Sequence, residues 1–512
     1  MPHGAAFERA KRRSCGAPAL TDRPVRLATD VRVVGAELYF LPVRTRVPLK
    51  FGAETLTSVT CARVRLTVRD SQGRTACGWG ETPLNVEWVW PSASPYETRR
   101  RITHDFCTRL VDCWSVFPVT GHPLQIGEAF QRTVLQDELD NVNQGVADAD
   151  RLPLLAALLC CSAFDIALYD AFGNLHGIPA MHSLTKEFCS SDLSSFLDSD
   201  DGVDFRGRYP ADYLRPRRLE SLPAWHLVGG ADPLTPDEAG APPAYDGHPV
   251  FLSDWIKRDG LKCLKVKLRG SDYEWDLLRL TQVGEVAQSH GVEHLTADFN
   301  CTVTDPNYVV EIIDQLARQA PAVHDRLLYI EQPFPYDLEK HMIDVREVSR
   351  RKPLLMDESA HNWELVRVGR ALGWTGVALK TCKTLTGALL SLCWAKAHGM
   401  GLMVQDLTNP MLAQIPHLTL AAYTETLMGV ETNAMQFYPD ASAIEASVHP
   451  GIYRRRSGRV ELSTLGDHGF GYRIDEIDRI LPAPVASRIA ADGGAPLPHF
   501  RSRHADAARS DS

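Results

Sequence analysis

Alternating hydrophobic and polar residues predict β-strands at the start of the chain, from 33 to 43 and from 58 to 69. A third strand ends at residues 78–81 (Gly-Trp-Gly-Glu). A helical region follows from 95 to 132, and the strongly apolar run from 152 to 172 predicts a long helix. The first part of the chain is therefore expected to form an α+β module that precedes the main domain.

From residue 225 onward the pattern changes to short apolar runs that alternate with amphipathic stretches, as in a parallel sheet with connecting helices. An open doubly wound sheet fits this repeat almost as well as a barrel, so the positions of the polar residues must decide. The predicted strands are 225–228, 263–268, 294–298, 327–331, 354–357, 376–380 and 401–404, with helices at 275–289, 308–319, 340–349, 363–371 and 385–398.

Composition and charge narrow the class of protein. Hydrophobic residues make up 44% of the 512 residues and charged residues 23%, which is typical of a globular protein with a large core. The net charge of −9 gives no reason to expect a nucleic-acid or membrane partner. The twelve cysteines are scattered without a Cys-x-x-Cys pair, and neither a spanning run of about 20 apolar residues nor a secretory signal is evident. We expect a cytoplasmic protein with reduced thiols.

Five successive predicted strands of the second half end on charged residues. In a parallel barrel the carboxyl ends of all strands meet at one mouth, where active sites lie. A single charged strand end is ordinary, because strand ends leave the core, but five in register favour a barrel with a common site. The residues are Lys265 and Lys267, Asp298, Glu331, Asp357, and Lys380.

Three carboxylates that converge on one point repel each other unless a cation lies between them. Oxygen ligands favour Mg²⁺, or Mn²⁺. Such an ion binds a substrate carboxylate and stabilises the dianion that forms when the neighbouring carbon loses its proton. Lysines near a cation can serve as neutral bases, and Lys265 and Lys267 point to the same face of their strand.

With these motifs the chain resembles the enolase superfamily, and within it the muconate-lactonising-enzyme subgroup of the mandelate racemase/muconate lactonizing enzyme family. That subgroup includes dipeptide epimerases and o-succinylbenzoate synthases. The resemblance implies an α/β fold, a modified TIM barrel (β/α)₇β with an N-terminal α+β capping domain. The expected division is a disordered arm (1–30), the capping domain (31–185), an inserted loop (186–220), the barrel (221–440), a segment packing on the cap (441–482) and a disordered tail (483–512).

The resemblance also implies a role for each charged strand end. Lys267 and Lys380 match the acid/base lysines on opposite faces of the substrate, and Lys265 matches the lysine that holds or polarises the carboxylate. Asn300 matches a position beside the metal site. The metal ligands of the subgroup are matched by Asp298, Glu331 and Asp357.

Several assignments stay open. Glu358 directly follows Asp357 and could be the third metal ligand in its place. The end of the seventh strand departs from the subgroup's pattern, and Asp406 or Asn409 could contact substrate there. Trp88 lies in a loop of the cap and either contacts an apolar substrate group or packs the cap against the barrel.

The expected function is metal-dependent abstraction of the α-proton of a small-molecule carboxylate to give an enediolate. Two lysines on opposite faces favour a racemase or epimerase, an isomerase in general terms. If only one base acts, the same intermediate leads to syn-dehydration or cycloisomerisation. A barrel without turnover that serves in binding is the alternative from a different class. A homo-oligomer is expected from the resemblance alone.

Overall fold

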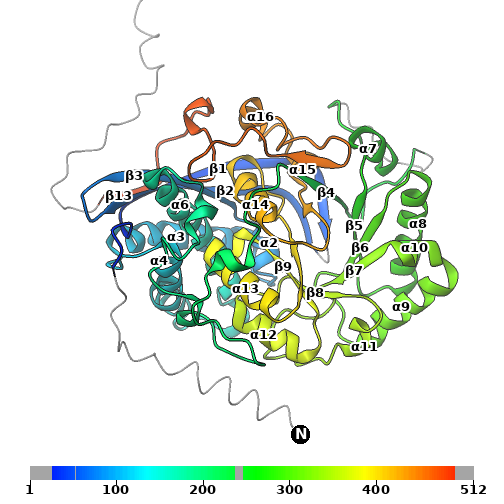
Figure 1. Ribbon diagram of the computed structural model, residues 1–512. Coiled ribbons are helices and arrows are strands. Elements are labelled where there is room, and N and C mark those ends of the chain that lie inside the picture. Colours follow the sequence, from blue (N-terminus) through cyan, green and yellow to red (C-terminus); the bar gives the residue numbers. More distant parts are fainter. Residues whose placement is uncertain (1–25, 52–53, 237–245, 490–512) are drawn as a thin grey trace, which may run out of the picture.

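The computed structural model describes residues 26–51, 54–236 and 246–489, and it contains an antiparallel sheet domain beside a curled parallel sheet (Figure 1). Most of the predicted arm (1–30) and most of the predicted tail (483–512) lie outside these residues. One part of the predicted tail is wrong, because residues 486–489 form strand β13. This strand pairs with the edge of β1 through backbone hydrogen bonds, which require no apolar pattern.

The first domain, which we call the cap, is built on a four-stranded antiparallel sheet whose fourth strand, β13, comes from residues 486–489. Its strands are β1 (Val31–Phe51), β2 (Glu54–Asp70) and β3 (Thr75–Pro83), in the order β13-β1-β2-β3. The helices of the cap are α2 (Val86–Val89), α3 (Tyr96–Val116), α4 (Pro123–Phe130), α5 (Gln136–Asn143) and α6 (Leu154–His176). Alternate residues of the strands are buried with α3 and α6 in one hydrophobic core.

The region from 95 to 132, predicted as helical, contains two helices with a break between them. His122 begins α4, because its Nδ1 accepts a hydrogen bond from the backbone N–H of Leu124 at 3.1 Å. The segment 148–176, which includes α6, is long and apolar enough to cross a membrane, contrary to the expectation from the sequence. In the structure 89% of its apolar window is buried, as in the core helix of a globular fold.

The second domain is a curled parallel sheet in the order β10-β9-β8-β7-β6-β5-β4-β11. A hydrogen bond from Leu427 N, in the turn that precedes β11, to Leu402 O of β10 (2.8 Å) brings the two ends of this order together. The sheet is thus a modified TIM barrel, as predicted. Its strands are β4 (Ser221–Val228), β5 (Cys263–Lys267), β6 (His294–Asp298), β7 (Leu327–Glu331), β8 (Leu354–Met356), β9 (Gly376–Leu379), β10 (Gly401–Val404) and β11 (Val430–Glu431).

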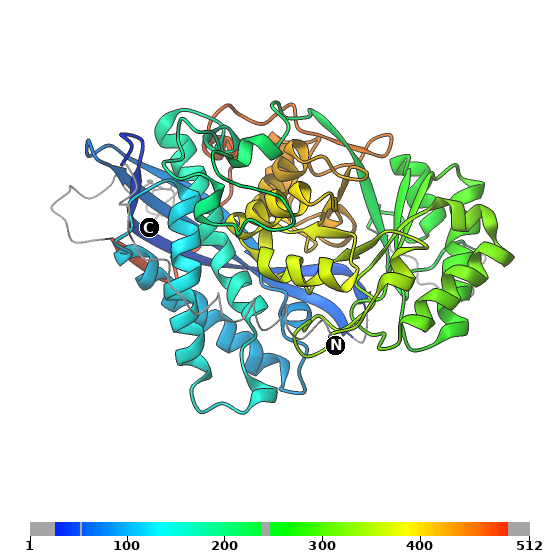
Figure 2. The same ribbon diagram turned by 60° about the horizontal axis from the view of Figure 1, so that its bottom comes forward.

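Helices connect and cover the barrel strands (Figures 1 and 2). They are α7 (Leu252–Asp259), α8 (Tyr273–Ser289), α9 (Pro306–Gln319), α10 (Pro321–Arg326), α11 (Arg346–Ser349), α12 (Trp363–Leu372), α13 (Leu385–Ala397) and α14 (Gln414–Tyr423). The helix predicted over 340–349 is wrong in its first half. The helix begins only at Arg346, without a side-chain hydrogen bond from its N-cap residue Val345, and Asp344 Oδ1 accepts a hydrogen bond from Arg346 N at 3.0 Å that holds a turn just before the helix.

The insertion from 186 to 220 is not merely a surface loop. It contains short 3₁₀ turns at Leu193–Ser195 and Pro210–Tyr213, and it buries Leu193, Leu197 and Phe205 in the barrel core. Leu193 and Leu197 share one turn, in which Leu197 N donates to Leu193 O at 2.8 Å, and this single turn is too short to give a helical pattern in the sequence.

The last segment contacts both domains. Strand β12 (Arg459–Glu461) pairs antiparallel with β4, while α15 (Ala434–Phe437) and α16 (Ala443–Val448) precede it. Glu445 of α16 accepts a hydrogen bond from buried Arg63 of the cap at 3.2 Å. The hairpin of β1 and β2 also reaches the barrel, where Gly230 N donates to Lys50 O at 3.3 Å (Figure 2). These contacts fix the cap over one end of the barrel.

Candidate active site

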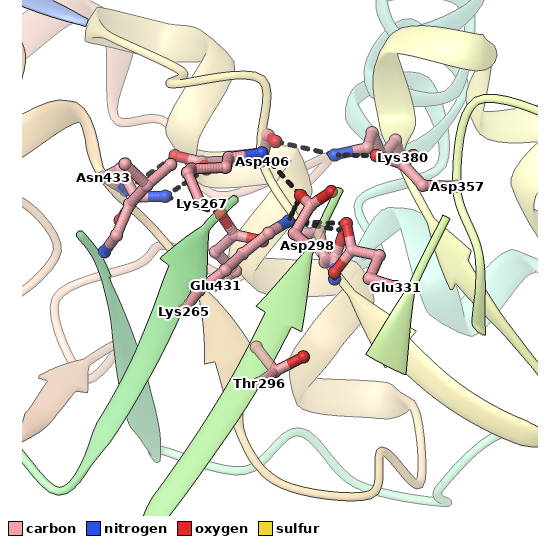
Figure 3. A network of polar contacts seen from close by, with 12 residues as sticks. Lys265, Lys267, Thr296, Asp298, Glu331, Asp357, Lys380, Asp406, Glu431 and Asn433 are labelled. Carbon is pink, nitrogen blue, oxygen red and sulfur yellow. Dashed lines mark hydrogen bonds and ion pairs between the residues drawn. The ribbon is translucent and has the colours of Figure 1, made fainter. Parts of the chain in front are cut away.

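The charged strand ends lie together at the carboxyl edge of the curled sheet, which we call the barrel mouth (Figure 3). Lys267 is in register with Asp298 on β6, and Asp298 is in register with Glu331 on β7. Asp357 and Lys380 directly follow β8 and β9. All of these side chains are buried. The structure thus brings together the residues that the sequence predicts to converge.

Lys265 lies among three carboxylates. Its Nζ is 2.5 Å from Glu331 Oε1, 2.9 Å from Glu431 Oε2 and 3.0 Å from Asp298 Oδ2. Burial lowers the pKa of this lysine, but the charges of Glu331, Glu431 and Asp298 raise it by more, so that the net pKa lies well above the ordinary value. Lys265 is therefore an ammonium group in this arrangement.

Asp298 contacts a second lysine as well. Lys267 Nζ donates a hydrogen bond to Asp298 Oδ2 at 2.5 Å, so one oxygen of this carboxylate faces both ammonium groups of the Lys-x-Lys pair. Burial raises the pKa of Asp298, whereas Lys267 and Lys265 lower it by more, and the net pKa is well below the ordinary value. Asp298 is thus an anion at neutral pH.

Asp357 is paired with lysines that follow β9. Lys380 Nζ lies 3.2 Å from Asp357 Oδ2 and donates to the backbone oxygen of Asp406 at 3.0 Å. Lys383 Nζ lies 3.2 Å from Asp357 Oδ1. Burial raises the pKa of Asp357, but Lys380 and Lys383 lower it by more. Lys380 follows β9, and Lys267 ends β5 four strands away in the barrel order, so the two lysines approach the barrel mouth from different sides (Figure 3).

Trp88 extends from α2 of the cap to these lysines. Its ring centroid is 5.3 Å from Lys380 Nζ and 5.7 Å from Lys383 Nζ, within the range of a cation–π interaction. Its indole Nε1 donates a hydrogen bond to Glu358 Oε1 at 2.9 Å. Of the two predicted roles, the structure shows the contact between cap and barrel.

Glu358 is buried beside the predicted metal ligands. Its Oε1 also accepts a hydrogen bond from Asn300 Nδ2 at 3.1 Å. Burial, together with the charges of Asp357 and Asp298, raises the pKa of Glu358. Within the described part of the chain, Glu358 Oε2 and Asn300 Oδ1 are buried without a hydrogen-bond partner. Two buried acceptor oxygens thus lie next to the carboxylate cluster.

This set of donors fits a hard divalent cation in its chemistry. Three buried carboxylates at consecutive strand ends, flanked by the unpaired oxygens of Asn300 and Glu358, are the oxygen ligands that Mg²⁺ prefers. In the present arrangement lysine ammonium groups contact these carboxylates. Accordingly, among the described residues no three acidic, histidine or cysteine side chains already surround a common point. A cation must therefore compete with Lys265 for Asp298 and Glu331.

The loop after β10 holds the two other predicted substrate contacts. Asp406 Oδ2 accepts backbone hydrogen bonds from Asn433 at 2.7 Å and from Asn409 at 3.3 Å. Burial and the charge of Glu431 raise the pKa of Asp406 to about 6. Asn409 Oδ1 accepts from Leu407 N, so this side chain shapes its own loop. Both residues lie at the barrel mouth, and both already have partners within the protein.

Three polar residues of the site were not predicted from the sequence. Glu431 ends β11, Asn433 follows it, and Gln405 follows β10, where its Nε2 donates to Glu331 Oε2 at 2.6 Å. Glu431 follows the pattern of the charged strand ends that were predicted, since the segment Val430-Glu431 is an apolar residue followed by an acid. A strand of two residues gives no periodic signal, however, and the strand itself was not predicted.

Comparison with known proteins supports the resemblance. Residues 251–478 match the family model described as enolase C-terminal domain-like. Over 226 residues the chain is 26% identical to an aromatic dipeptide epimerase of Herpetosiphon aurantiacus. This alignment covers 43% of the chain and 59% of the relative, so the chain spans less than two thirds of the curated relative that it matches.

Solved structures resemble the whole fold. A dipeptide epimerase from Enterococcus faecalis, complexed with Mg and the dipeptide L-Leu-L-Tyr, superimposes with a TM-score of 0.56 at 15% identity. This match covers 86% of the chain and 99% of that structure. A muconate lactonizing enzyme from Pseudomonas fluorescens gives a TM-score of 0.54 at 15% identity, over 86% of the chain and 96% of that structure. The predicted enolase-superfamily resemblance and fold are confirmed.

Proposed function

We propose that this chain, which has the enolase-superfamily fold, is a divalent-metal-dependent racemase or epimerase. In this proposal it removes the α-proton of a small-molecule carboxylate to give an enediolate, and then returns a proton to that carbon. The observation that carries the proposal is the position of Lys267 and Lys380, which approach the barrel mouth from different sides with three buried carboxylates beside them. Two bases around one substrate carbon are what inversion at that carbon needs.

In the proposed mechanism, Asp298, Glu331 and Asp357 hold Mg²⁺, or Mn²⁺. The cation would neutralise the negative charge that develops on the substrate carboxylate. Lys265 donates a hydrogen bond to that carboxylate. Lysine is a base only in its neutral form, which a nearby cation favours. One of Lys267 and Lys380 then takes the α-proton, and the other returns a proton to the opposite face.

The substrate class is part of the proposal. Dipeptides are the first compounds to test, because the sequence relative and one solved structure named above are dipeptide epimerases. We propose Asn300, Asp406, Asn409 and Trp88 as the residues that contact substrate. Asn300 N donates to Asp298, Lys380 donates to the backbone oxygen of Asp406, Asn409 N donates to Asp406, and the ring of Trp88 lies by Lys380. A cytoplasmic location and a homo-oligomeric state complete the proposal.

A one-base elimination, as in a syn-dehydratase or cycloisomerase, is the second candidate. The contacts of Lys380 favour it. This lysine is held by Asp357 and by the backbone oxygen of Asp406, and the ring of Trp88 lies over it. If these contacts persist with substrate bound, only Lys267 reaches the α-proton, and the intermediate must expel a leaving group.

The test is α-proton exchange. The protein is incubated in D₂O with Mg²⁺ and a panel of dipeptides, amino acids, N-acyl amino acids and acid sugars, and deuterium uptake is followed by NMR. We expect uptake at an α-carbon that is abolished by EDTA and, for one configuration of the substrate, by Lys267→Ala. Lys262→Ala, on the protein surface, is the matched control and retains uptake. Exchange that persists in EDTA would contradict the metal-dependent mechanism.

A further inference from the structure

Glu431 is a further acid at the barrel mouth, and the proposed mechanism leaves it without a role. It comes from β11, on the far side of Lys265 from β6 and β7 in the order of strands. Glu431 is 3% exposed, and its Oε2 accepts a hydrogen bond from Lys265 Nζ at 2.9 Å. Lys265 thus has three acidic partners, of which two are proposed metal ligands and one is not.

A bound cation would change the set of acidic partners around Lys265. An ammonium group and a divalent cation cannot both lie against the same oxygens of Asp298 and Glu331, because like charges repel strongly in a buried site. When the cation takes these two carboxylates, Lys265 loses two of its three acidic contacts. A buried ammonium group without an acidic partner carries a large desolvation penalty. Glu431 is the remaining partner among the three.

We propose that Glu431 is a positioning residue that retains the ammonium group of Lys265 at the barrel mouth when a divalent cation binds Asp298 and Glu331. This inference rests on the proposed function, because it requires the metal site. Glu431 thereby lowers the cost of metal binding and keeps Lys265 where a substrate carboxylate would arrive.

The surroundings of Glu431 fit this role. Its Oε1 accepts a hydrogen bond from Asn433 Nδ2 at 2.8 Å, and Asn433 is in turn held by Asp406 through its backbone N–H. One oxygen of Glu431 is thus fixed to the loop after β11, and the other faces Lys265. Gln405 Nε2 holds the second oxygen of Glu331 at 2.6 Å, so Glu331 also keeps its orientation without Lys265.

The experiment measures Mn²⁺ affinity, by the EPR signal of free Mn²⁺, in a double-mutant cycle of the full chain. Glu431→Gln is expected to raise the Mn²⁺ dissociation constant about tenfold or more. In a Lys265→Gln background, which has no ammonium group to retain, the same substitution is expected to change it less than about threefold. Asp406→Asn is the matched control, because it removes a negative charge of the same barrel mouth but keeps a side-chain oxygen that can accept from the backbone N–H groups of Asn409 and Asn433.

Three results overturn the inference. An equal loss of affinity in both backgrounds would mean that Glu431 acts on the cation directly. An equal loss of Mn²⁺ affinity in Asp406→Asn would mean that any negative charge at the barrel mouth supports metal binding, without a specific pairing of Glu431 with Lys265. No loss in Glu431→Gln would mean that Lys265 needs no such partner, while the proposed function would stand. If the wild-type protein binds no Mn²⁺, the metal site of the proposed function itself is wrong.

The Lys265→Gln background could fail to fold, since Lys265 compensates three buried acids. A crystal structure of the wild-type protein with Mn²⁺ then decides. We expect Lys265 Nζ within hydrogen-bonding distance of Glu431 and away from Asp298 and Glu331. A Lys265 side chain that points elsewhere in that structure would overturn the inference.

Discussion

Trp88 of the cap donates a hydrogen bond from its indole Nε1 to Glu358 Oε1 of the barrel, at 2.9 Å. The same ring faces the ammonium groups of Lys380 and Lys383, and Trp88 is only 8% exposed. Glu358 in turn accepts from Asn300, which follows Asp298 by two residues. The cap thus reaches the surroundings of the proposed metal site through a single side chain, so the position of the cap and the geometry of the site are linked.

Trp88→Phe tests this link. The substitution keeps an aromatic ring near the lysines but removes the N–H that Glu358 accepts, which we expect to lower the free energy of unfolding by about 1–2 kcal/mol. It should also raise KM for an accepted substrate, because Glu358 is freed to move. Trp90→Phe, in the same segment and also buried, is the control. We expect the control to lower stability without changing KM, and equal KM effects would contradict the link.

The identity of the third metal ligand can be decided by two neighbouring substitutions. Asp357→Asn removes a carboxylate that faces Lys380 and Lys383, and we expect Mn²⁺ binding to fall about 100-fold or more. Glu358→Gln changes a residue that is bonded to Trp88 and Asn300, and the expected loss is about tenfold or less. Titration calorimetry measures the Mn²⁺ affinity of both variants. If Glu358→Gln lost more affinity than Asp357→Asn, Glu358 would be the third metal ligand.

The sequence predicted the barrel strands well for a physical reason. Strands β6, β7 and β10 have the predicted bounds, because a buried parallel strand is a short apolar run that stops at a charged or polar residue. Strand β11 was missed, since two residues carry no period. The first half of the helix at 340–349 was wrong, because an amphipathic composition does not reveal the turn that Asp344 forms before Arg346.

The gathering of charged strand ends was predictable for the same reason, whereas their pairing was not. Lys265 and Glu431 are 166 positions apart, and their contact exists only because β11 pairs with β4 beside β5. Such a contact depends on strand order, which hydrophobic patterning does not specify. The roles of the residues as bases and metal ligands stay predictions.

Buried Asp170 predicts a pH dependence of stability. Its pKa is raised from 3.8 to about 7 by burial, although backbone N–H groups of Phe470 and Trp79 and the side chain of Asn174 oppose this. Because the folded-state pKa exceeds the unfolded one, the folded state binds the proton more tightly. The contribution of Asp170 to the free energy of unfolding is therefore fully present below about pH 4 and is lost as the pH rises through about 7.

Asp170→Asn cannot titrate and serves as the reference. The free energy of unfolding of the wild type, relative to that of Asp170→Asn, should fall by up to about 4 kcal/mol between pH 4 and pH 8. Urea unfolding at a series of pH values measures it. A difference that stays constant with pH would show that Asp170 has the same charge in both states.

The close approach of β3 to α6 depends on glycine. A Cβ at Gly80 would lie 2.0 Å from the backbone oxygen of Ala163, so Gly80→Ala must push strand and helix apart. We expect a loss of about 1–3 kcal/mol or more in the free energy of unfolding. Gly230→Ala, where the nearest atoms lie 3.8 Å away, is the control and should be near neutral. Similar unfolding midpoints for both variants would contradict this packing.

The stereochemistry of proton exchange distinguishes two bases from one. If Lys267 and Lys380 act on opposite faces, Lys267→Ala should abolish exchange from one enantiomer of the substrate, and Lys380→Ala from the other. Each loss should be about 10²–10⁴-fold, the usual contribution of general acid–base catalysis. NMR in D₂O with each pure enantiomer measures the four rates.

The one-base alternative gives a different pattern. Lys380 would then only hold Asp357 and the backbone oxygen of Asp406, as it does in the present structure. Lys380→Ala would slow the reaction of a single configuration, through weaker metal binding, and Lys267→Ala would abolish that same reaction. An excess of Mn²⁺ would restore activity to Lys380→Ala in this case, whereas no metal concentration replaces a missing proton donor.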